Sequence, residues 1–225
     1  GTGSNCTQTA INASIEAEKC GVDGLLQVVP YYNKPSQAGL EAHFTRIANE
    51  TNLPILLYNI PGRTGINMSA ETTARLAQHP RIFGIKEASG DLEQVKQIRH
   101  LSPDEFLIYS GDDANTLSFM KEGAYGVVSV GAHCAGLDIK AMITAFLAGD
   151  DQTAAAINQK LADLFEVLFI TSNPSPVKAA LTEMGFQVGG PRLPLVAVTK
   201  EEHAAILTVL TTLNLTQKFA GASSK

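Results

Sequence analysis

The chain has 225 residues, of which 44% are hydrophobic and 17% are charged, and its formal net charge is −5 at pH 7. This composition is typical of a globular protein with an ample core. Its mild acidity, without a cluster of basic residues, argues against a nucleic-acid partner. No apolar run reaches the roughly 20 residues that a membrane span needs, so we also expect no membrane partner.

Cysteines and histidines narrow the class of protein further. The three cysteines are scattered and form no C-x-x-C pair, which favours a reducing, cytoplasmic compartment over a disulfide framework. The five histidines show no ligand spacing such as H-E-x-x-H, so we expect no metal site. The sequence also lacks a glycine-rich dinucleotide fingerprint, a Walker A loop and a G-x-S-x-G elbow, which removes the usual support for doubly wound and hydrolase folds.

In chain order, helix-like and strand-like stretches alternate up to about residue 150. Residues 1–21 have the pattern of a strand end followed by its helix. Short apolar runs then predict five strands, at residues 24–29, 54–59, 82–88, 106–113 and 125–132. Helical periodicity follows each of them, at residues 37–50, 70–78, 92–101, 114–123 and 140–149.

The predicted strands are apolar on both faces and are joined to the helices by short connections, which indicates buried parallel strands in an α/β fold. Beyond residue 150 the sequence predicts three helices and no strand, at residues 153–170, 175–185 and 200–213. We therefore expect a domain at residues 1–150 that holds the strands, and a three-helix C-terminal appendix at residues 151–225.

The number of strands leaves the architecture open at this point. A (β/α)8 TIM barrel has eight strands, whereas five are visible here, and the chain begins in the middle of a strand–helix repeat. The fold is either an open sheet of five to six parallel strands or a barrel whose first units are absent from this sequence.

Polar side chains gather at the carboxyl ends of the predicted strands, where the active site of a barrel lies. In strand order they are Tyr31, Tyr32 and Asn33; Tyr58, Asn59 and Arg63; Lys86 and Glu87; Ser110, Gly111, Asp112 and Asp113; and Ser129. A single tyrosine at a strand end is often only a cover over the core. The convergence of tyrosines with Lys86 and Arg63 on one rim favours a functional site.

Lys86 offers the most specific chemistry among these residues. A lysine amine attacks a ketone only when it is neutral, and partial burial at a strand end lowers its pKa toward that state. The resulting intermediate must lose water and an α-proton, which Tyr58 could relay, while Arg63 could hold a substrate carboxylate. These residues predict class I Schiff-base chemistry, condensation or cleavage, without a metal or another cofactor.

Five motifs carry a resemblance to a known family: "VVPYYNKPSQAGL", "LPILLYNIPGRTG", "GIKEASGDL", "YSGDDANTL" and "NPSPVKAAL". From Gly1 to about residue 213 the chain resembles the dihydrodipicolinate synthase family. The resemblance implies a (β/α)8 barrel with a C-terminal helical appendix, here without its first two to three strands. It implies a lyase that condenses pyruvate with L-aspartate 4-semialdehyde to 4-hydroxy-tetrahydrodipicolinate in lysine and diaminopimelate biosynthesis. It also implies a homo-oligomer, either a dimer or a tetramer.

The resemblance assigns roles to individual positions. Lys86 matches the Schiff-base former, which binds pyruvate covalently, and Tyr58 matches the proton relay. Tyr32 matches a residue that this family inserts into the relay of a neighbouring subunit. Arg63 matches the group that holds the carboxylate of the second substrate at the mouth of the site.

Two further positions and one missing motif concern the pyruvate site. Gly111 and Val128 match backbone positions that line bound pyruvate, and the second of these is commonly an isoleucine in the family. The family's relay also uses a threonine from a "TTGE" segment, and no such segment occurs in this sequence. We therefore expect that the sequence lacks the N-terminal part of a longer enzyme.

Lysine feedback is a property of regulated family members, which use an asparagine, a glutamate four residues later and the first tyrosine of "PYYN". Asn5 and Tyr31 fit this allosteric pattern, but Thr9 stands where the glutamate is expected. A neutral side chain cannot make a charge-assisted contact with the lysine ammonium. We expect weak or absent inhibition by lysine.

Other functions remain open at this point. A sister pyruvate aldolase, such as N-acetylneuraminate lyase or a 2-keto-3-deoxy sugar acid aldolase, would share Lys86 and Tyr58 but generally lacks an arginine at the position of Arg63. A truncated, inactive family member is a second alternative. A hydrolase that uses Glu87 with Asp112 is a third and weaker one, because nothing in the sequence places the two carboxylates as a pair.

Overall fold

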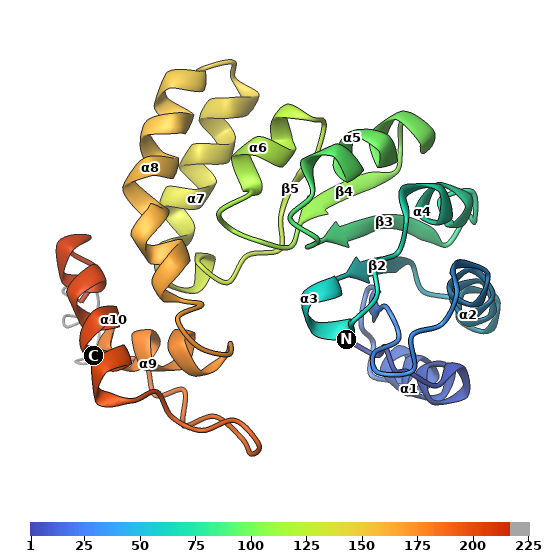
Figure 1. The fold of residues 1–225 in the computed structure, drawn as a ribbon, viewed down its shortest axis with the longest axis horizontal. Coiled ribbons are helices and arrows are strands. Elements are labelled where there is room, and N and C mark those ends of the chain that lie inside the picture. The colour runs from blue at the N-terminus through green and yellow to red at the C-terminus, as the bar shows by residue number, and fades with distance from the viewer. Residues whose placement is uncertain (217–225) are drawn as a thin grey trace. The chain divides into compact units, whose positions relative to one another are not determined.

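The computed structural model describes residues 1–216, and its strands form a single parallel sheet in chain order (Figure 1). The strands are β1 (Leu25–Val28), β2 (Ile55–Asn59), β3 (Ile82–Glu87), β4 (Leu107–Ser110) and β5 (Gly126–Val127). Each strand pairs with the one before it, whereas the strand order of a doubly wound sheet reverses at a switch point. The predicted α/β fold with a parallel sheet is confirmed.

Helices accompany the strands in residues 1–128. They are α1 (Thr7–Lys19), α2 (Gln37–Glu50), α3 (Pro61–Thr64), α4 (Ala70–Leu76), α5 (Leu92–Leu101) and α6 (Thr116–Lys121). Consecutive longer helices pack side by side, α1 on α2, α2 on α4 and α4 on α5. They form one layer beside the sheet, and α3 is a single turn that directly follows β2 (Figure 1).

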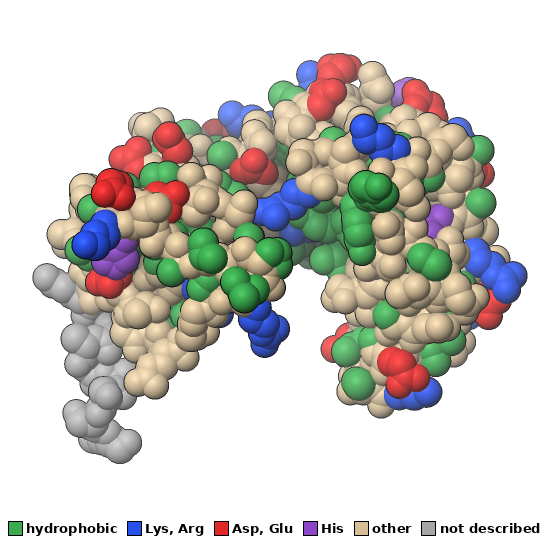
Figure 2. Space-filling model, turned by 60° about the horizontal axis from the view of Figure 1, so that its bottom comes forward, with side chains coloured by type: hydrophobic (Ala, Val, Ile, Leu, Met, Phe, Trp, Pro, Cys, Tyr) green, Lys and Arg blue, Asp and Glu red, His purple; other side chains and the backbone are tan. Residues whose placement is uncertain are grey.

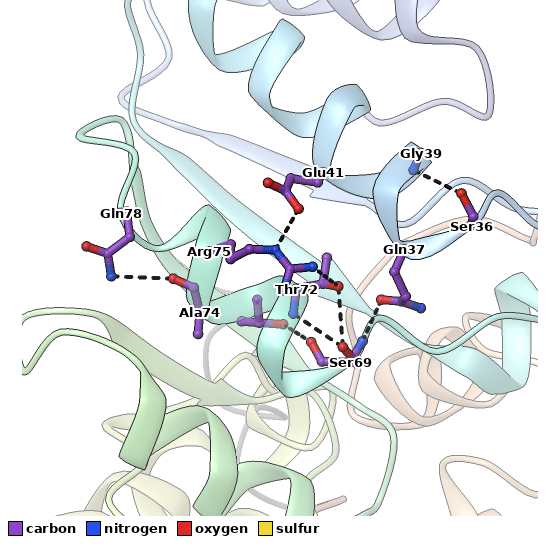
Figure 3. A network of polar contacts seen from close by, with 10 residues as sticks. Ser36, Gln37, Gly39, Glu41, Ser69, Thr72, Ala74, Arg75 and Gln78 are labelled. Carbon is purple, nitrogen blue, oxygen red and sulfur yellow. Dashed lines mark hydrogen bonds and ion pairs between the residues drawn. The ribbon is translucent and has the colours of Figure 1, made fainter.

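Polar contacts fix α4 against α2. Nε of Arg75 in α4 donates a hydrogen bond to Oε2 of Glu41 in α2 at 2.7 Å, and the Ser69 N–H donates to Oε1 of Gln37 at 3.0 Å (Figure 3). The Ser69 hydroxyl caps α4 by accepting a bond from the Thr72 N–H. This cap satisfies a backbone donor that the first turn of a helix leaves without an intrahelical partner.

Burial alternates along the central strands, so the two faces of the sheet differ. Ile55 and Leu57 of β2 are fully buried, whereas Leu56 and Tyr58 between and after them are only half-buried. Successive side chains of a strand point to opposite faces. One face is therefore buried in the core, and the other carries Tyr58 and Lys86. The largest fully buried side chains include Phe44, Phe106, Phe119, Leu40, Ile47, Leu57, Ile85, Ile98 and Ile108.

Gly84 lies at an irregularity in the pairing of β3 with β2 and at a close approach of β3 to β4. Ile55 of β2 pairs with Ile82, but the next residue, Leu56, pairs with Gly84, so one residue of β3 is skipped. A Cβ at Gly84 would lie 2.4 Å from the carbonyl oxygen of Leu107 in β4. Only a glycine allows the two backbones to approach so closely.

Residues 1–128 and 129–225 form two compact units, of which the second is described up to residue 216. Its helices are α7 (Ala132–Leu147), α8 (Asp151–Val167), α9 (Ser175–Glu183) and α10 (Lys200–Thr212). In this unit α7 and α10 each pack against both α8 and α9. The predicted domains 1–150 and 151–225 would place α7 with the strands, and that division of the chain remains a prediction.

The end of the sheet differs from the sequence-based expectation. The predicted strand at residues 125–132 is limited to Gly126 and Val127, and α7 begins at Ala132. Among the described strands β5 pairs only with β4, so its ladder stops where β4 ends at Ser110. Apolar sequence alone does not define a strand that has a partner on one side only.

The surface carries mixed charge. On the face seen in Figure 2, acidic and basic side chains are interspersed. The exposed ion pairs, such as Arg46 with Glu50 at 2.8 Å, are of the kind that contributes little to stability. Among the helices of residues 1–216, none is both long and apolar enough to cross a membrane.

His43 links α1 to α2 and is sensitive to acid. Its Nδ1 lies 2.9 Å from the Thr7 hydroxyl, and its side chain is only 6% exposed. Its Nε2 has no hydrogen-bond partner within the described part of the chain. Burial lowers the pKa of His43 from 6.5 to about 4, so the folded state holds the neutral imidazole.

We predict that acid destabilises the protein through His43. Because the folded pKa is lowered, the unfolded chain binds the proton first, and stability falls as pH drops from 6.5 toward 4. The loss should reach about 2 kcal/mol between pH 7 and pH 5. Urea unfolding of His43→Leu should show a flatter pH dependence over this range, whereas His100→Leu, at an exposed position, should behave as wild type. An equal slope in wild type and His43→Leu would contradict this explanation.

Candidate active site

The register of the parallel strands brings Tyr58 and Lys86, which were predicted as site residues, into one row with a third residue, Tyr109. Tyr58 of β2 pairs with Lys86 of β3, and Lys86 pairs with Tyr109 of β4. Paired residues of adjacent strands point to the same face of a sheet. The Lys86 Nζ lies 4.2 Å from the centre of the Tyr58 ring. An amine and two phenols therefore share the half-buried face near the carboxyl ends of the strands.

Lys86 has surroundings that favour a neutral amine. Burial lowers the pKa of Lys86, the Asp113 carboxylate opposes this by raising it, and the Arg63 guanidinium lowers it further. The Asp113 side chain is itself buried. A lowered pKa makes the unprotonated amine more available at neutral pH, as a nucleophile requires.

Tyr58 is held as a neutral phenol. Burial raises the pKa of its hydroxyl, although the positive charge of Arg63 opposes the shift. A phenol that stays protonated can donate a proton and accept one in turn. Next to an amine that undergoes addition and loss of water, such a group has the chemistry of a proton relay.

Gly111 lies against Lys86 at the end of β4. Its N–H donates a hydrogen bond to the carbonyl oxygen of Glu87 at 2.7 Å. A Cβ at this position would lie 3.1 Å from Cε of Lys86 and 2.7 Å from Cβ of Ala88. The missing side chain therefore leaves room for the lysine side chain and for backbone contact with a ligand beside it.

Arg63 is placed on the turn that follows β2. The turn forms α3, with Pro61 in its first position, where proline needs no backbone donor. The Arg63 side chain is exposed, while its charge acts on both Tyr58 and Lys86. A guanidinium at this place can bind an incoming carboxylate in a bidentate manner.

The loop after β1 carries Tyr31, Tyr32 and Asn33, whose contacts are with segments other than β3. Tyr32 is 88% exposed, has a φ of +73°, and donates its N–H to the Thr64 carbonyl at 3.3 Å. Tyr31 is also exposed, and Nδ2 of Asn33 donates to the Asn5 carbonyl at 2.8 Å. The structure thus brings the loop together with Asn5 and with the α3 turn.

Val128 and Glu87 lie outside the row formed by Tyr58, Lys86 and Tyr109. Val128 follows β5, two strands away from Lys86, and donates its N–H to the Ser110 carbonyl at 2.9 Å. Glu87 points to the buried face, where it is fully enclosed. Its carboxylate is bound by Asn59, Ser89 and Gln94, whereas Oδ1 of Asp112 accepts a hydrogen bond from the Ala114 N–H.

Tyr109 is a neighbour of Lys86 that the sequence interpretation missed. It lies on the same face as Lys86, and its ring meets that of Tyr125 edge to face at 5.6 Å. Burial raises the pKa of Tyr109, and the neighbouring Tyr125 raises it too. Its place beside Lys86 follows from the pairing of β3 with β4, which the sequence of residues 107–110 alone does not show.

The site offers no arrangement typical of a metal centre. Within residues 1–216, no group of three or more His, Cys, Asp or Glu side chains is positioned to hold a metal ion. The chemistry of the described side chains is that of an amine, phenols and a guanidinium. These groups support covalent catalysis and proton transfer.

Comparisons with known proteins identify the family of the chain. Residues 1–213 match the model of the dihydrodipicolinate synthetase family. A relative from Moorella thermoacetica, named 4-hydroxy-tetrahydrodipicolinate synthase, is 56% identical over 210 residues, which cover 93% of this chain and 72% of the relative. A relative of the same name from Desulforamulus reducens is 51% identical over 216 residues, which cover 96% of this chain and 73% of the relative.

Solved structures show the same relationship. The crystal structure of dihydrodipicolinate synthase from Cyanidioschyzon merolae with lysine bound is 49% identical, with a TM-score of 0.94 over 96% of this chain and 73% of that one. The enzyme from Acinetobacter baumannii, crystallised in complex with pyruvate, is 41% identical, with a TM-score of 0.92 over 96% of this chain and 74% of that one. By sequence and by structure, the chain belongs to the dihydrodipicolinate synthetase family.

Proposed function

We propose that the protein is a 4-hydroxy-tetrahydrodipicolinate synthase, a lyase of lysine and diaminopimelate biosynthesis. It condenses pyruvate with L-aspartate 4-semialdehyde through a Schiff base on Lys86. The observation that carries the proposal is the position of the Lys86 amine, half-buried and 4.2 Å from the centre of the Tyr58 ring. The names of the family's curated relatives support the same reaction.

The first stage follows from the chemistry of these groups. The neutral Lys86 amine adds to the ketone carbon of pyruvate and forms a carbinolamine, with Tyr58 delivering a proton to the developing alkoxide. Loss of water gives the protonated imine. Its positive nitrogen draws electrons from the adjacent methyl group, so no metal or other cofactor is needed for the α-proton to leave.

The second stage joins the two substrates. Removal of a methyl proton gives an enamine, whose carbon attacks the aldehyde carbon of aspartate semialdehyde and forms the new carbon–carbon bond. The aldehyde oxygen takes up a proton and becomes the 4-hydroxyl group. The amino group that came from aspartate semialdehyde then adds to the imine carbon and displaces the Lys86 amine, which closes the ring and frees the lysine. We assign to Arg63 the binding of the second substrate's carboxylate at the mouth of the site.

Other parts of the proposal concern the remaining positions of the site, the oligomer and the fold. Gly111 and Val128 are assigned to the backbone that lines bound pyruvate. Tyr32 is assigned to the relay of a neighbouring subunit, which its 88% exposed side chain supports. This role requires a homo-oligomer, a dimer or tetramer, and we place the enzyme in the cytoplasm. We further propose a barrel that includes strands beyond the five described here, with α8, α9 and α10 as the C-terminal appendix.

We predict a covalent pyruvate adduct on Lys86. Incubation with pyruvate and borohydride should add a reduced pyruvate to this residue, as located by peptide mass spectrometry. Lys86→Ala should lose the adduct and about three orders of magnitude in turnover or more. Lys96→Ala, which removes an exposed lysine of α5, should retain both. An intact, folded protein that forms no adduct would contradict the Schiff-base mechanism.

The identity of the second substrate is tested by measuring turnover of pyruvate with each of two candidate partners. Pyruvate with aspartate semialdehyde should give turnover, whereas pyruvate with N-acetylmannosamine should not. The opposite preference would identify a sister aldolase.

We predict that adduct formation depends on pH with a midpoint below 10.5, the ordinary pKa of lysine. The rate should rise with pH, because only the unprotonated amine attacks. Arg63→Gln removes a charge that lowers the pKa of Lys86, so its midpoint should move to higher pH, while Arg46→Gln in α2 should leave it unchanged. A midpoint that stays fixed in Arg63→Gln would show that the guanidinium does not act on the amine.

We predict weak or absent inhibition by lysine. Thr9, an exposed residue of α1, offers no charge to a lysine ammonium, although Asn5 and Tyr31 retain the allosteric pattern. Thr9→Glu should gain inhibition in steady-state assays, and the neutral Thr9→Gln should not. Micromolar inhibition of the wild-type enzyme would refute this prediction.

A further inference from the structure

Glu87 is the neighbour of Lys86 in β3 and lies on the opposite face of the sheet. Its register partner is Asn59, which in turn follows Tyr58 in β2. Both Asn59 and Glu87 have an exposed fraction of 0%. Tyr58 and Lys86 are thus each followed in the chain by a residue that is fixed on the buried face.

The Glu87 carboxylate accepts four hydrogen bonds. Nδ2 of Asn59 lies 3.2 Å from one carboxylate oxygen and 3.0 Å from the other. The Ser89 N–H donates to Oε1 at 2.7 Å, and Nε2 of Gln94 in α5 donates to Oε2 at 3.1 Å. All of these donors are amide nitrogens, and both oxygens of the carboxylate accept hydrogen bonds.

The network reaches the segment after the α3 turn. Nδ2 of Asn59 also lies 2.7 Å from Oδ1 of Asn67, and Nδ2 of Asn67 donates to Oε1 of Gln94 at 2.6 Å. The Met68 N–H donates to Oδ1 of Asn59 at 3.0 Å. The ends of β2 and β3, the start of α5 and residues 67–68 are therefore joined through side chains around Glu87.

Stability alone does not account for a carboxylate at this position. No ion pair to Glu87 occurs among the described residues, and burial raises the pKa of this group. A buried charge that only neutral hydrogen-bond donors compensate is expensive, and an apolar or neutral packing is often as stable or more so. The carboxylate does provide what a neutral side chain cannot, two oxygens that both accept and so fix Asn59, Ser89 and Gln94 together.

We propose that Glu87 is a positioning residue for the Schiff-base reaction, clamping the ends of β2 and β3 from the buried face so that Tyr58 and Lys86 keep the spacing needed for proton transfer. The proposal rests on the proposed function of Lys86. A small displacement of a reacting group has a large effect on rate. Glu87 itself contacts neither reacting side chain, so it should affect the rate of the chemical steps more than the binding of pyruvate.

The test measures the rate at which pyruvate and borohydride trap the adduct on Lys86, as a function of pyruvate concentration. Glu87→Gln keeps the size of the side chain but turns one acceptor oxygen into a donor. We expect the maximal trapping rate to fall about tenfold or more, while the half-saturating pyruvate concentration changes less than about threefold. Glu93→Gln, an exposed position at the start of α5, is the matched control and should behave as wild type.

A second variant guards against a folding defect in Glu87→Gln. Gln94→Met removes one bond to the carboxylate and retains Glu87, and its maximal rate should fall in the same direction by a smaller factor. Circular dichroism and thermal unfolding show whether each variant is folded. Wild-type maximal rates in folded Glu87→Gln overturn the proposal, as do wild-type rates in Gln94→Met if Glu87→Gln does not fold. A fall due entirely to weaker pyruvate saturation overturns it too.

The outcome in the wild-type protein separates the two proposals. If wild type forms no adduct, the proposed function fails. If wild type forms the adduct and the variants trap it at the same maximal rate, only the positioning role of Glu87 fails.

Discussion

The pairing of β2 with β3 sets the geometry on which the site depends. Their parallel register places Tyr58 beside Lys86 on one face and Asn59 beside Glu87 on the other. Tyr58 and Lys86 supply a phenol and an amine. Asn59 and Glu87 are fully buried and hydrogen-bonded to each other. A change of register by one residue would exchange the faces, burying the lysine among apolar side chains and exposing the carboxylate.

The surroundings of Lys86 combine opposite electrostatic effects. Burial and the charge of Arg63 favour the neutral amine, while Asp113 favours the ammonium. Such a balance suits the proposed reaction, in which Lys86 is a nucleophile at one step and carries positive charge as an imine at the next. Arg63 can influence Lys86 from an exposed position, because α3 begins directly after β2 and keeps Arg63 near the carboxyl end of that strand.

The parts of the structure that follow from local sequence signals could be predicted. Apolar runs of strand length, separated by helical periodicity, indicate the parallel sheet, and the lysine at the end of such a run indicates the site. The position of Tyr109 on the face of Lys86 depends on the register of β4 against β3, which neither segment shows by itself. The surroundings of Glu87 likewise come from Asn59 and Gln94, which are distant in sequence. Pairing between distant segments is decided by tertiary packing, and it determines which polar residues become neighbours.

Gly84 shows how a residue without a functional group can control chemistry. Its Cα faces the Leu107 carbonyl so closely that any side chain must push β3 away from β4. Lys86 lies two residues further along β3 and Tyr109 two residues further along β4. In a survey of single substitutions scored by activity, this position would rank with the reacting residues although it contacts no reacting atom. Sensitivity to substitution therefore marks the backbone that aligns this site as well as the groups that act in it.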